Sequence, residues 1–143
     1  MYDIAIIGAG VVGGMIARNL AKYNANICIL EKENDVAMGA TRANSAIVHA
    51  GYDPEPGTDM AKYNVAGCAY TAELCAKLDV PYKNIGSLVV AFADEEMATI
   101  QELYDRGNEN GCPGLEIWDA DAFESYESET VNDTYGNFKQ IKK

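Results

Sequence analysis

Three glycines in the stretch AIIGAGVVGG, at positions 8, 10 and 13, constrain the fold of this chain more than any other feature. They follow an apolar run, residues 2–7, that predicts a short buried strand. Residues 11–23 carry apolar or small side chains at helical spacing, and NICILE, residues 26–31, predicts a second buried strand. Strand, glycine turn, helix and strand in this order form a βαβ unit, so we expect an α/β fold with two parallel strands.

The glycine spacing G-x-G-x-x-G suits the pyrophosphate of a dinucleotide. Gly8 allows a tight turn, and Gly10 lets the main chain approach phosphates at the positive N-terminus of the helix, while Gly13 permits close packing of helix and strand. Glu31 ends the second strand, where a carboxylate accepts hydrogen bonds from an adenosine ribose. Glu31 disfavours a 2′-phosphate, although the adjacent Lys32 weakens that argument. The signature predicts a Rossmann-like fold, and a tight turn without any ligand is the alternative.

Charge and composition exclude several classes of partner. The chain has 143 residues, room for one domain, with 11 Lys and Arg against 22 Asp and Glu and a net charge of -11. Such a field repels nucleic acids and anionic membranes. The uncharged run from Ile4 to Ala17 is too short for a transmembrane segment, and Asp3 stands where a secretory leader would be basic, so a cytoplasmic location is expected. The four cysteines form no C-x-x-C pair, which favours free buried thiols over a metal site.

The remainder of the chain predicts further helices and strands around one long irregular segment. Residues 34–57 lose all periodicity and are rich in small and hydrogen-bonding side chains. Thr58 is predicted to cap a helix that runs to about residue 78, and residues 86–93 predict a strand. Asp94 is expected to cap the next helix. A turn at NGCPG, a short strand at residues 115–118 and a short helix at residues 119–126 complete the prediction.

The glycine loop alone does not separate NAD from FAD, because both contain adenosine diphosphate, but the next segment does. YDIAIIGAGVVGGMIARNLAKYNANICILEKE, followed by GATRANSAIVHAGYDPEPGT, resembles the D-amino-acid-oxidase-type FAD-dependent oxidoreductases. Within them the chain is most similar to the glycerol-3-phosphate dehydrogenase and L-2-hydroxyglutarate dehydrogenase group. The resemblance runs from about residue 2 to 126, and residues 39–57 are its specific part. It implies a glutathione-reductase-type FAD-binding domain.

The resemblance also implies which residues hold the cofactor. Gly8, Gly10, Gly13 and Glu31, with Lys32 beside it, would hold adenosine diphosphate. Thr41, Arg42, Asn44 and Ser45 would line the portion from pyrophosphate to flavin, although Arg42 could equally be a solvent-exposed cation. His49 would lie near the isoalloxazine ring and is the candidate catalytic residue, its alternative being a histidine tucked into the core by one backbone hydrogen bond.

The family's members are considerably longer, so the chain is expected to be an N-terminal piece. Residues 1–81 would be the first FAD-binding segment, and residues 82–143 the beginning of an α+β substrate domain. The implied reaction oxidises a small anionic substrate, a hydroxy acid or a polyol phosphate, by hydride transfer to flavin. The electron acceptor is unknown. Two alternatives remain open at this point: a nicotinamide-dependent dehydrogenase, and a non-catalytic fragment that binds a nucleotide.

Overall fold

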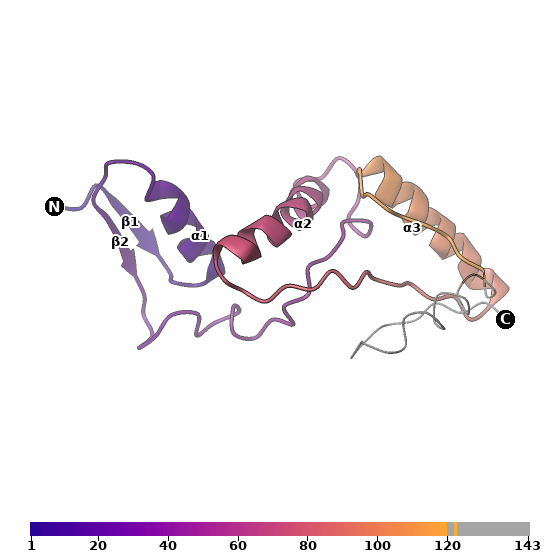
Figure 1. The fold of residues 1–143 in the computed structure, drawn as a ribbon, viewed down its shortest axis with the longest axis horizontal. Helices are drawn as coiled ribbons and strands as arrows, with labels where there is room; N and C mark the ends of the chain where they lie inside the picture. Colours follow the sequence, from indigo (N-terminus) through magenta and orange to yellow (C-terminus); the bar gives the residue numbers. More distant parts are fainter. Residues whose placement is uncertain (120–121, 123–143) are drawn as a thin grey trace. The chain divides into compact units, whose positions relative to one another are not determined.

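The computed structural model, drawn in Figure 1, describes residues 1–119 and 122. The described part of the chain divides into two compact units, residues 1–47 and the residues from 48 onward. The first unit is a βαβ arrangement, and the second contains the longer helices. In chain order the elements are β1 (Ile4–Ile7), α1 (Val11–Leu20), β2 (Ile27–Leu30), α2 (Asp59–Lys77), the 3-10 helix η1 (Asp94–Glu96) and α3 (Met97–Glu109).

Strands β1 and β2 pair in parallel, as the sequence predicts, with Ile4 opposite Ile27 and Ile7 opposite Leu30. Asp3 fixes the start of this register. Its carboxylate accepts a hydrogen bond of 2.8 Å from the backbone N–H of Asn26, and its own backbone N–H donates to the Asn26 carbonyl at 2.8 Å. The α/β class and the parallel pair are therefore confirmed, and each strand is shorter than the apolar run that predicts it.

Helix α1 follows the glycine turn and ends three residues before the predicted end at residue 23. The difference has a local cause, because the backbone N–H of Tyr23 donates to the carbonyl of Leu20 at 2.9 Å, a bond that tightens the chain into a turn. The turn shortens the path from the helix to the start of β2.

Few side chains of residues 1–47 are buried. Ile6 is 8% exposed, whereas its neighbour Ile7 is 88% exposed and Leu30 is 56% exposed. Strands of parallel sheets are usually covered on both faces. In this unit, by contrast, part of the apolar surface of the strand pair faces solvent.

Helix α2 begins as its sequence predicts. The side chain of Thr58 accepts a hydrogen bond of 3.2 Å from the backbone N–H of Ala61, and its hydroxyl donates to the Glu55 carbonyl at 2.7 Å. Asp59 lies in the first turn, where a negative charge is favourable. The predicted cap is confirmed, and the helix ends at Lys77, one residue before the predicted end.

The start of α3 differs from the prediction. Asp94 opens η1 rather than capping α3, and no side chain makes a capping hydrogen bond at either helix start. The Glu96 carboxylate accepts instead a hydrogen bond of 2.7 Å from the backbone N–H of Phe92. Three consecutive acids, Asp94 to Glu96, stand at the start of this segment, and in the structure they form a 3-10 turn that precedes α3.

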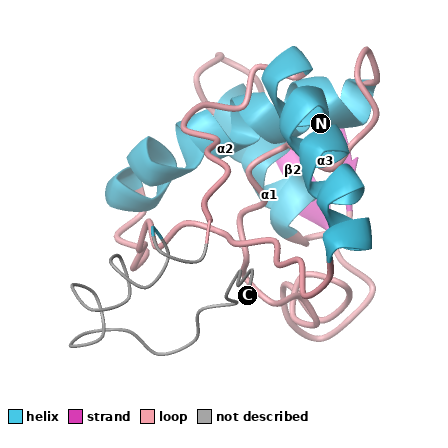
Figure 2. Ribbon diagram, turned by 90° about the vertical axis from the view of Figure 1, so that its right-hand side faces the viewer, coloured by secondary structure: helices cyan, strands magenta, loops and turns pink. Residues whose placement is uncertain are grey.

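Two predicted strands are wrong. Residues 86–93 and 115–118 have irregular conformations, and β1 and β2 are the only strands in the described part of the chain (Figure 2). A strand needs a neighbour for its backbone hydrogen bonds. Leu88, Val89 and Val90 are nevertheless half-buried and Ala91 is 3% exposed, so their apolar character serves packing. The predicted helix 119–126 falls outside the described residues apart from positions 119 and 122.

The four cysteines are free, and the predicted burial holds for Cys112 alone, because the other three are half-buried. Every helix in the described part of the chain is too short or too polar to span a membrane. The predicted boundary between a cofactor segment, 1–81, and a substrate domain, 82–143, stays a prediction.

Candidate functional site

The glycine loop connects the end of β1 to the start of α1, and its first residue makes a turn that only glycine adopts easily. Gly8 has a φ of +100°, in the region that side chains rarely tolerate. Its backbone N–H donates to the carbonyl of Leu30 at 2.7 Å, which ties the loop to the end of the neighbouring strand β2.

Gly13 allows α1 to lie directly on this loop. A Cβ atom at position 13 would overlap the carbonyl oxygen of Gly8, and it would lie 3.1 Å from the carbonyl carbon of Gly8 and 3.4 Å from Cγ2 of Ile6. Two of these atoms belong to the backbone and cannot rotate away. The close packing expected from the third glycine is therefore present, between the helix and the turn that precedes it.

Gly10 stands at the N-terminus of α1, next to a side chain from 31 positions later in the sequence. The Thr41 hydroxyl accepts a hydrogen bond of 2.9 Å from the backbone N–H of Val11, and a Cβ atom at position 10 would lie 2.9 Å from that hydroxyl oxygen. Gly10 itself makes no side-chain cap. Thr41 thus supplies the first N–H of the helix with the acceptor that helix starts require.

Glu31 points its carboxylate at the same loop. One oxygen accepts the backbone N–H of Ala9 at 2.7 Å, and the other accepts the N–H groups of Lys32 at 2.8 Å and Glu33 at 3.1 Å. These hydrogen bonds, the one from Ala9 foremost, lower the pKa of Glu31 below its ordinary value. The carboxylate is therefore held ionised and oriented at the end of β2.

A cavity of about 510 Å³ opens between the glycine loop, the end of β2 and the segment that follows β2. Its volume lies within the range of about 300–1,000 Å³ that is typical of small-molecule sites. Five of the predicted cofactor residues line it: Gly8, Gly10, Glu31, Lys32 and Thr41. The other lining residues are Ile7, Leu30, Glu33, Ala37, Met38, Gly39 and Ala40.

The remaining predicted residues of this unit, Gly13, Arg42, Asn44 and Ser45, lie outside the cavity lining. Arg42 is exposed, with a guanidinium nitrogen 3.7 Å from the Met38 sulfur. Asn44 shapes the loop, since its side-chain oxygen accepts the backbone N–H of Ala46 at 2.6 Å and its side-chain nitrogen donates to the Thr41 carbonyl. Ser45 is exposed.

Lys32 lines the cavity, and its ammonium forms an exposed ion pair of 3.3 Å with Glu33.

Ala37 is a residue of the cavity that the sequence did not single out. It adopts a φ of +61°, which is uncommon for a residue with a side chain, and its backbone N–H donates to the Ala9 carbonyl at 3.0 Å. This bond attaches the segment after β2 to the glycine loop. Three small residues, Ala37, Gly39 and Ala40, are the signal that could have indicated a close approach of the main chain.

His49 belongs to the second unit, residues 48–143, and its side chain is exposed. His49 is therefore not tucked into a core in this chain, and its role stays a prediction. Among residues 1–119 and 122, no three His, Cys, Asp or Glu side chains gather closely enough to hold a metal ion.

Comparison with known proteins shows the family of this chain. The model of the family described as "FAD dependent oxidoreductase" matches residues 3–139. A glycerol 3-phosphate dehydrogenase from Caloramator mitchellensis is 56% identical over 117 residues, which are 82% of this chain and 24% of that protein. The mitochondrial L-2-hydroxyglutarate dehydrogenase of Homo sapiens is 40% identical over 118 residues, 81% of this chain and 26% of that protein.

A solved structure is similar as well. The dithionite-reduced L-alpha-glycerophosphate oxidase from Mycoplasma pneumoniae, with FAD bound, superimposes with a TM-score of 0.69 at 31% identity. The match covers 81% of this chain and 30% of that one. The chain thus spans between about a quarter and a third of the length of the relatives that it matches.

Proposed function

Since the chain belongs to the family of FAD-dependent oxidoreductases, we propose that residues 1–47 hold the adenosine diphosphate half of FAD in the cavity beside the glycine loop. The observation that carries this proposal is the combination of Gly10 and Glu31 on one cavity. Gly10 presents no side chain at the positive end of α1, and Glu31 presents an ionised carboxylate. Pyrophosphate fits the first and the hydroxyls of an adenosine ribose fit the second.

Two backbone N–H groups, of the glycine loop and of the start of α1, already have partners within the chain. The N–H of Ala9 donates to Glu31, and that of Val11 donates to Thr41. A bound nucleotide would meet a glycine loop whose shape the side chains of Glu31 and Thr41 already hold. Such preorganisation lowers the ordering cost of binding.

We infer that the complete protein oxidises a hydroxy acid or a polyol phosphate, such as glycerol 3-phosphate or 2-hydroxyglutarate. FAD supplies a hydride acceptor when bound. Residues of the protein would orient the substrate hydroxyl and take its proton, and His49 is the candidate base because the resemblance implies a place near the isoalloxazine ring. The identities of 56% and 40% to dehydrogenases of these two substrates support the substrate class.

Finer assignments are part of the same proposal, and those that concern residues and domains rest on the resemblance. Thr41, Arg42, Asn44 and Ser45 line the path from pyrophosphate to flavin. The dinucleotide domain is of the glutathione-reductase type, and the residues from about 82 begin an α+β substrate domain. The location is cytoplasmic, and the electron acceptor stays unidentified.

Thermal denaturation of the 143-residue chain with added nucleotides tests the proposal. FAD and ADP are expected to raise the melting temperature, and NADP is not. The added stability grows with the logarithm of the ligand concentration over the dissociation constant, to about 2.7 kcal/mol at a hundredfold excess. Stabilisation by NADP without stabilisation by FAD would favour the nicotinamide alternative. If neither FAD nor ADP stabilises the chain, the proposed nucleotide site is refuted, and a non-catalytic module that binds no dinucleotide is the reading left. Bound flavin is also yellow, so the absorbance of the purified chain gives an independent reading.

A further inference from the structure

The residues that directly follow His49 have no helix or strand of their own. Side chains from the last turn of α3 and from Cys112, just beyond the helix, hold their backbone carbonyls. Cys112 donates its thiol hydrogen to the Ala50 carbonyl at 2.8 Å. The side-chain amide of Asn110 donates to the carbonyls of Gly51, at 3.0 Å, and Pro54, at 2.7 Å. Arg106 donates to the carbonyl of Asp53 at 2.9 Å.

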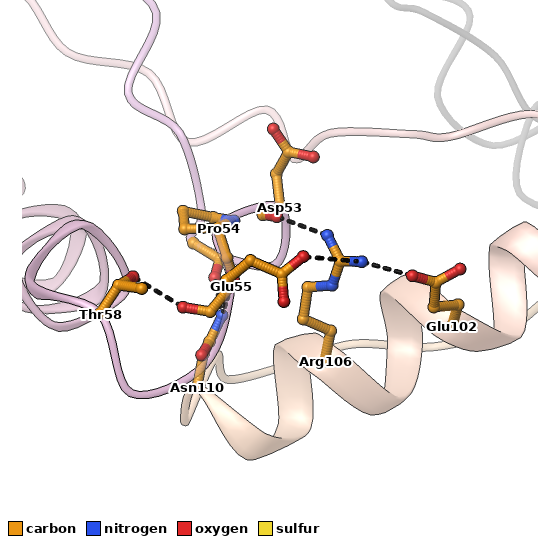
Figure 3. Close-up of polar contacts among 8 residues, drawn as sticks. Asp53, Pro54, Glu55, Thr58, Glu102, Arg106 and Asn110 are labelled. Atoms are coloured by element: carbon orange, nitrogen blue, oxygen red, sulfur yellow. Dashed lines mark hydrogen bonds and ion pairs between the residues drawn. The ribbon is translucent and has the colours of Figure 1, made fainter.

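We call Arg106, Asn110 and Cys112 the α3 clamp. Figure 3 shows the Arg106 side chain directed from α3 toward the Asp53 carbonyl, between the carboxylates of Glu55 and Glu102. The Arg106 side chain is only 20% exposed and lies 3.5 Å from the Glu55 carboxylate, and it also pairs with Glu102. Charge-assisted bonds of this kind are stronger than neutral ones. The clamp therefore holds four backbone carbonyls, of residues 50, 51, 53 and 54, by side chains at the C-terminal end of α3 and just beyond it.

Close packing reinforces these bonds from both sides. A Cβ atom at Gly107, which is buried in α3, would lie 2.8 Å from Cβ of Tyr52 and 2.5 Å from Cδ1 of Leu115. On the other side, a Cβ at Gly51 would lie 2.6 Å from Cγ2 of Val65, a residue of α2. The chain after His49 thus runs against the backbone of α3 and against α2, with no room for a side chain at either glycine.

The thiol of Cys112 belongs in the same device because its environment keeps it protonated. Burial, and next to it the neighbouring Cys68, raise the pKa of Cys112 above its ordinary value. A protonated thiol can donate to a carbonyl, whereas a thiolate cannot. The Ala50 carbonyl that it holds is the first one after His49.

We propose that the α3 clamp is a positioning device for His49, with Arg106 and Asn110 as its positioning residues; this inference rests on the role of His49 in the proposed function. The His49 side chain is exposed, so its place depends on its main chain. Consecutive Cα atoms are about 3.8 Å apart, so a held Ala50 leaves His49 little freedom. A base must be placed to within a fraction of an ångström, and a chain of irregular conformation does not achieve this without such support.

The backbone order parameter of His49 in the ligand-free, full 143-residue chain, from ¹⁵N relaxation, tests the proposal. Asn110→Ala is expected to lower it from about 0.85, typical of rigid backbone, to below about 0.6. Asn108→Ala is the matched control, because Asn108 also donates its side-chain amide to a carbonyl, that of Tyr104, at 2.8 Å, but within α3. Since the chain has one histidine, the imidazole signal of His49 is identified without ambiguity and should move toward its unfolded position in the same variant.

Two further variants separate positioning from general stability. Ile100→Val loses packing at a buried position of α3 outside the clamp, so it is expected to lower the melting temperature and leave the order parameter of His49 unchanged. Arg106→Gln removes the bond to the Asp53 carbonyl and carries the test if Asn110→Ala does not fold. An unchanged order parameter in both clamp variants, or an equal fall in Ile100→Val, would overturn the proposal. None of these measurements needs FAD, so failure of FAD to bind would refute the proposed function and leave the clamp result standing.

Discussion

Two adjacent glycines of α1 offer a sharp test of why the loop needs glycine. Gly13 is buried and Gly14 is exposed, and an added Cβ at Gly14 meets nothing within 4 Å. At Gly13 the same methyl group would overlap the Gly8 carbonyl oxygen. Gly13→Ala and Gly14→Ala thus make one chemical change at neighbouring positions of one helix, with opposite expected results.

The expected magnitudes follow from two terms. Replacing a helical glycine by alanine stabilises a helix by about 1 kcal/mol, and at Gly14 nothing opposes this gain. At Gly13, forcing a methyl group against a backbone that cannot rotate away costs about 3 kcal/mol, the upper end of the usual overpacking range. The net change is a loss of about 2 kcal/mol for Gly13→Ala. The two variants should therefore differ by about 3 kcal/mol in the free energy of unfolding.

Thermal unfolding followed by circular dichroism, and titration with ADP, measure both consequences. At about 2–4 °C per kcal/mol for a chain of this size, Gly13→Ala should melt about 4–8 °C below the parent and Gly14→Ala a few degrees above it. Because the Gly8 carbonyl must move to admit the methyl group, ADP should bind Gly13→Ala at least about tenfold more weakly, a loss of about 1.4 kcal/mol. Gly14→Ala should bind ADP as the parent does.

Equal melting temperatures and equal ADP affinities of the two variants would refute this reasoning. That result would mean that α1 does not lie on the glycine turn as closely as the contact between position 13 and Gly8 requires.

Four other outcomes are expected. Gly10→Val should abolish binding of ADP and FAD in a titration with smaller loss of stability than Gly13→Ala, because the side chain that it displaces, Thr41, can rotate away. The melting temperature of Glu31→Gln should fall less between neutral pH and about pH 3 than that of the parent. The lowered pKa of Glu31 means that its ionised form stabilises the fold above the ordinary carboxyl pKa, and this contribution is lost as the pH falls through the lowered pKa. Cys112 should be alkylated last of the four cysteines, as read by mass spectrometry of timed samples, since burial raises its pKa and leaves little thiolate. The 143-residue chain with FAD should not reduce an artificial electron acceptor when glycerol 3-phosphate or 2-hydroxyglutarate is added, and reduction at a rate proportional to protein would show that these residues form a complete active site.

The βαβ unit was predictable because its signals are local. Apolar runs of β-branched residues mark β1 and β2, and the glycine turn between strand and helix has few conformations available. Four of the predicted cofactor residues, Gly8, Gly10, Glu31 and Lys32, line one cavity for the same reason, since a short turn and a strand end leave little choice of position. Thr41 reaches the cavity from the irregular segment after β2, and its place was expected only from the resemblance. Thr58 at the start of α2 is an equally local signal, and it too was correct.

The failures came where the outcome depends on distant partners. Residues 86–93 have the composition of a strand, but pairing requires another strand, and composition does not reveal whether one is available. The α3 clamp joins residues more than fifty positions apart, and no sequence pattern marks Asn110 as the donor to Gly51 and Pro54. The positive φ of Ala37 is also not marked by a local pattern, and its backbone N–H bonds to a carbonyl 28 positions earlier, that of Ala9.

The exposed apolar side chains of the strand pair govern how the purified chain behaves in solution. Ile7 and Leu30 face solvent, and molecules that collide there would bury them against one another. The net charge of -11 opposes such collisions. The Debye length, over which this charge repulsion acts, is about 10 Å in 0.1 M salt and only about 3 Å in 1 M salt. We therefore expect the chain to scatter light and precipitate as salt is raised, and to keep best in dilute buffer at neutral or alkaline pH.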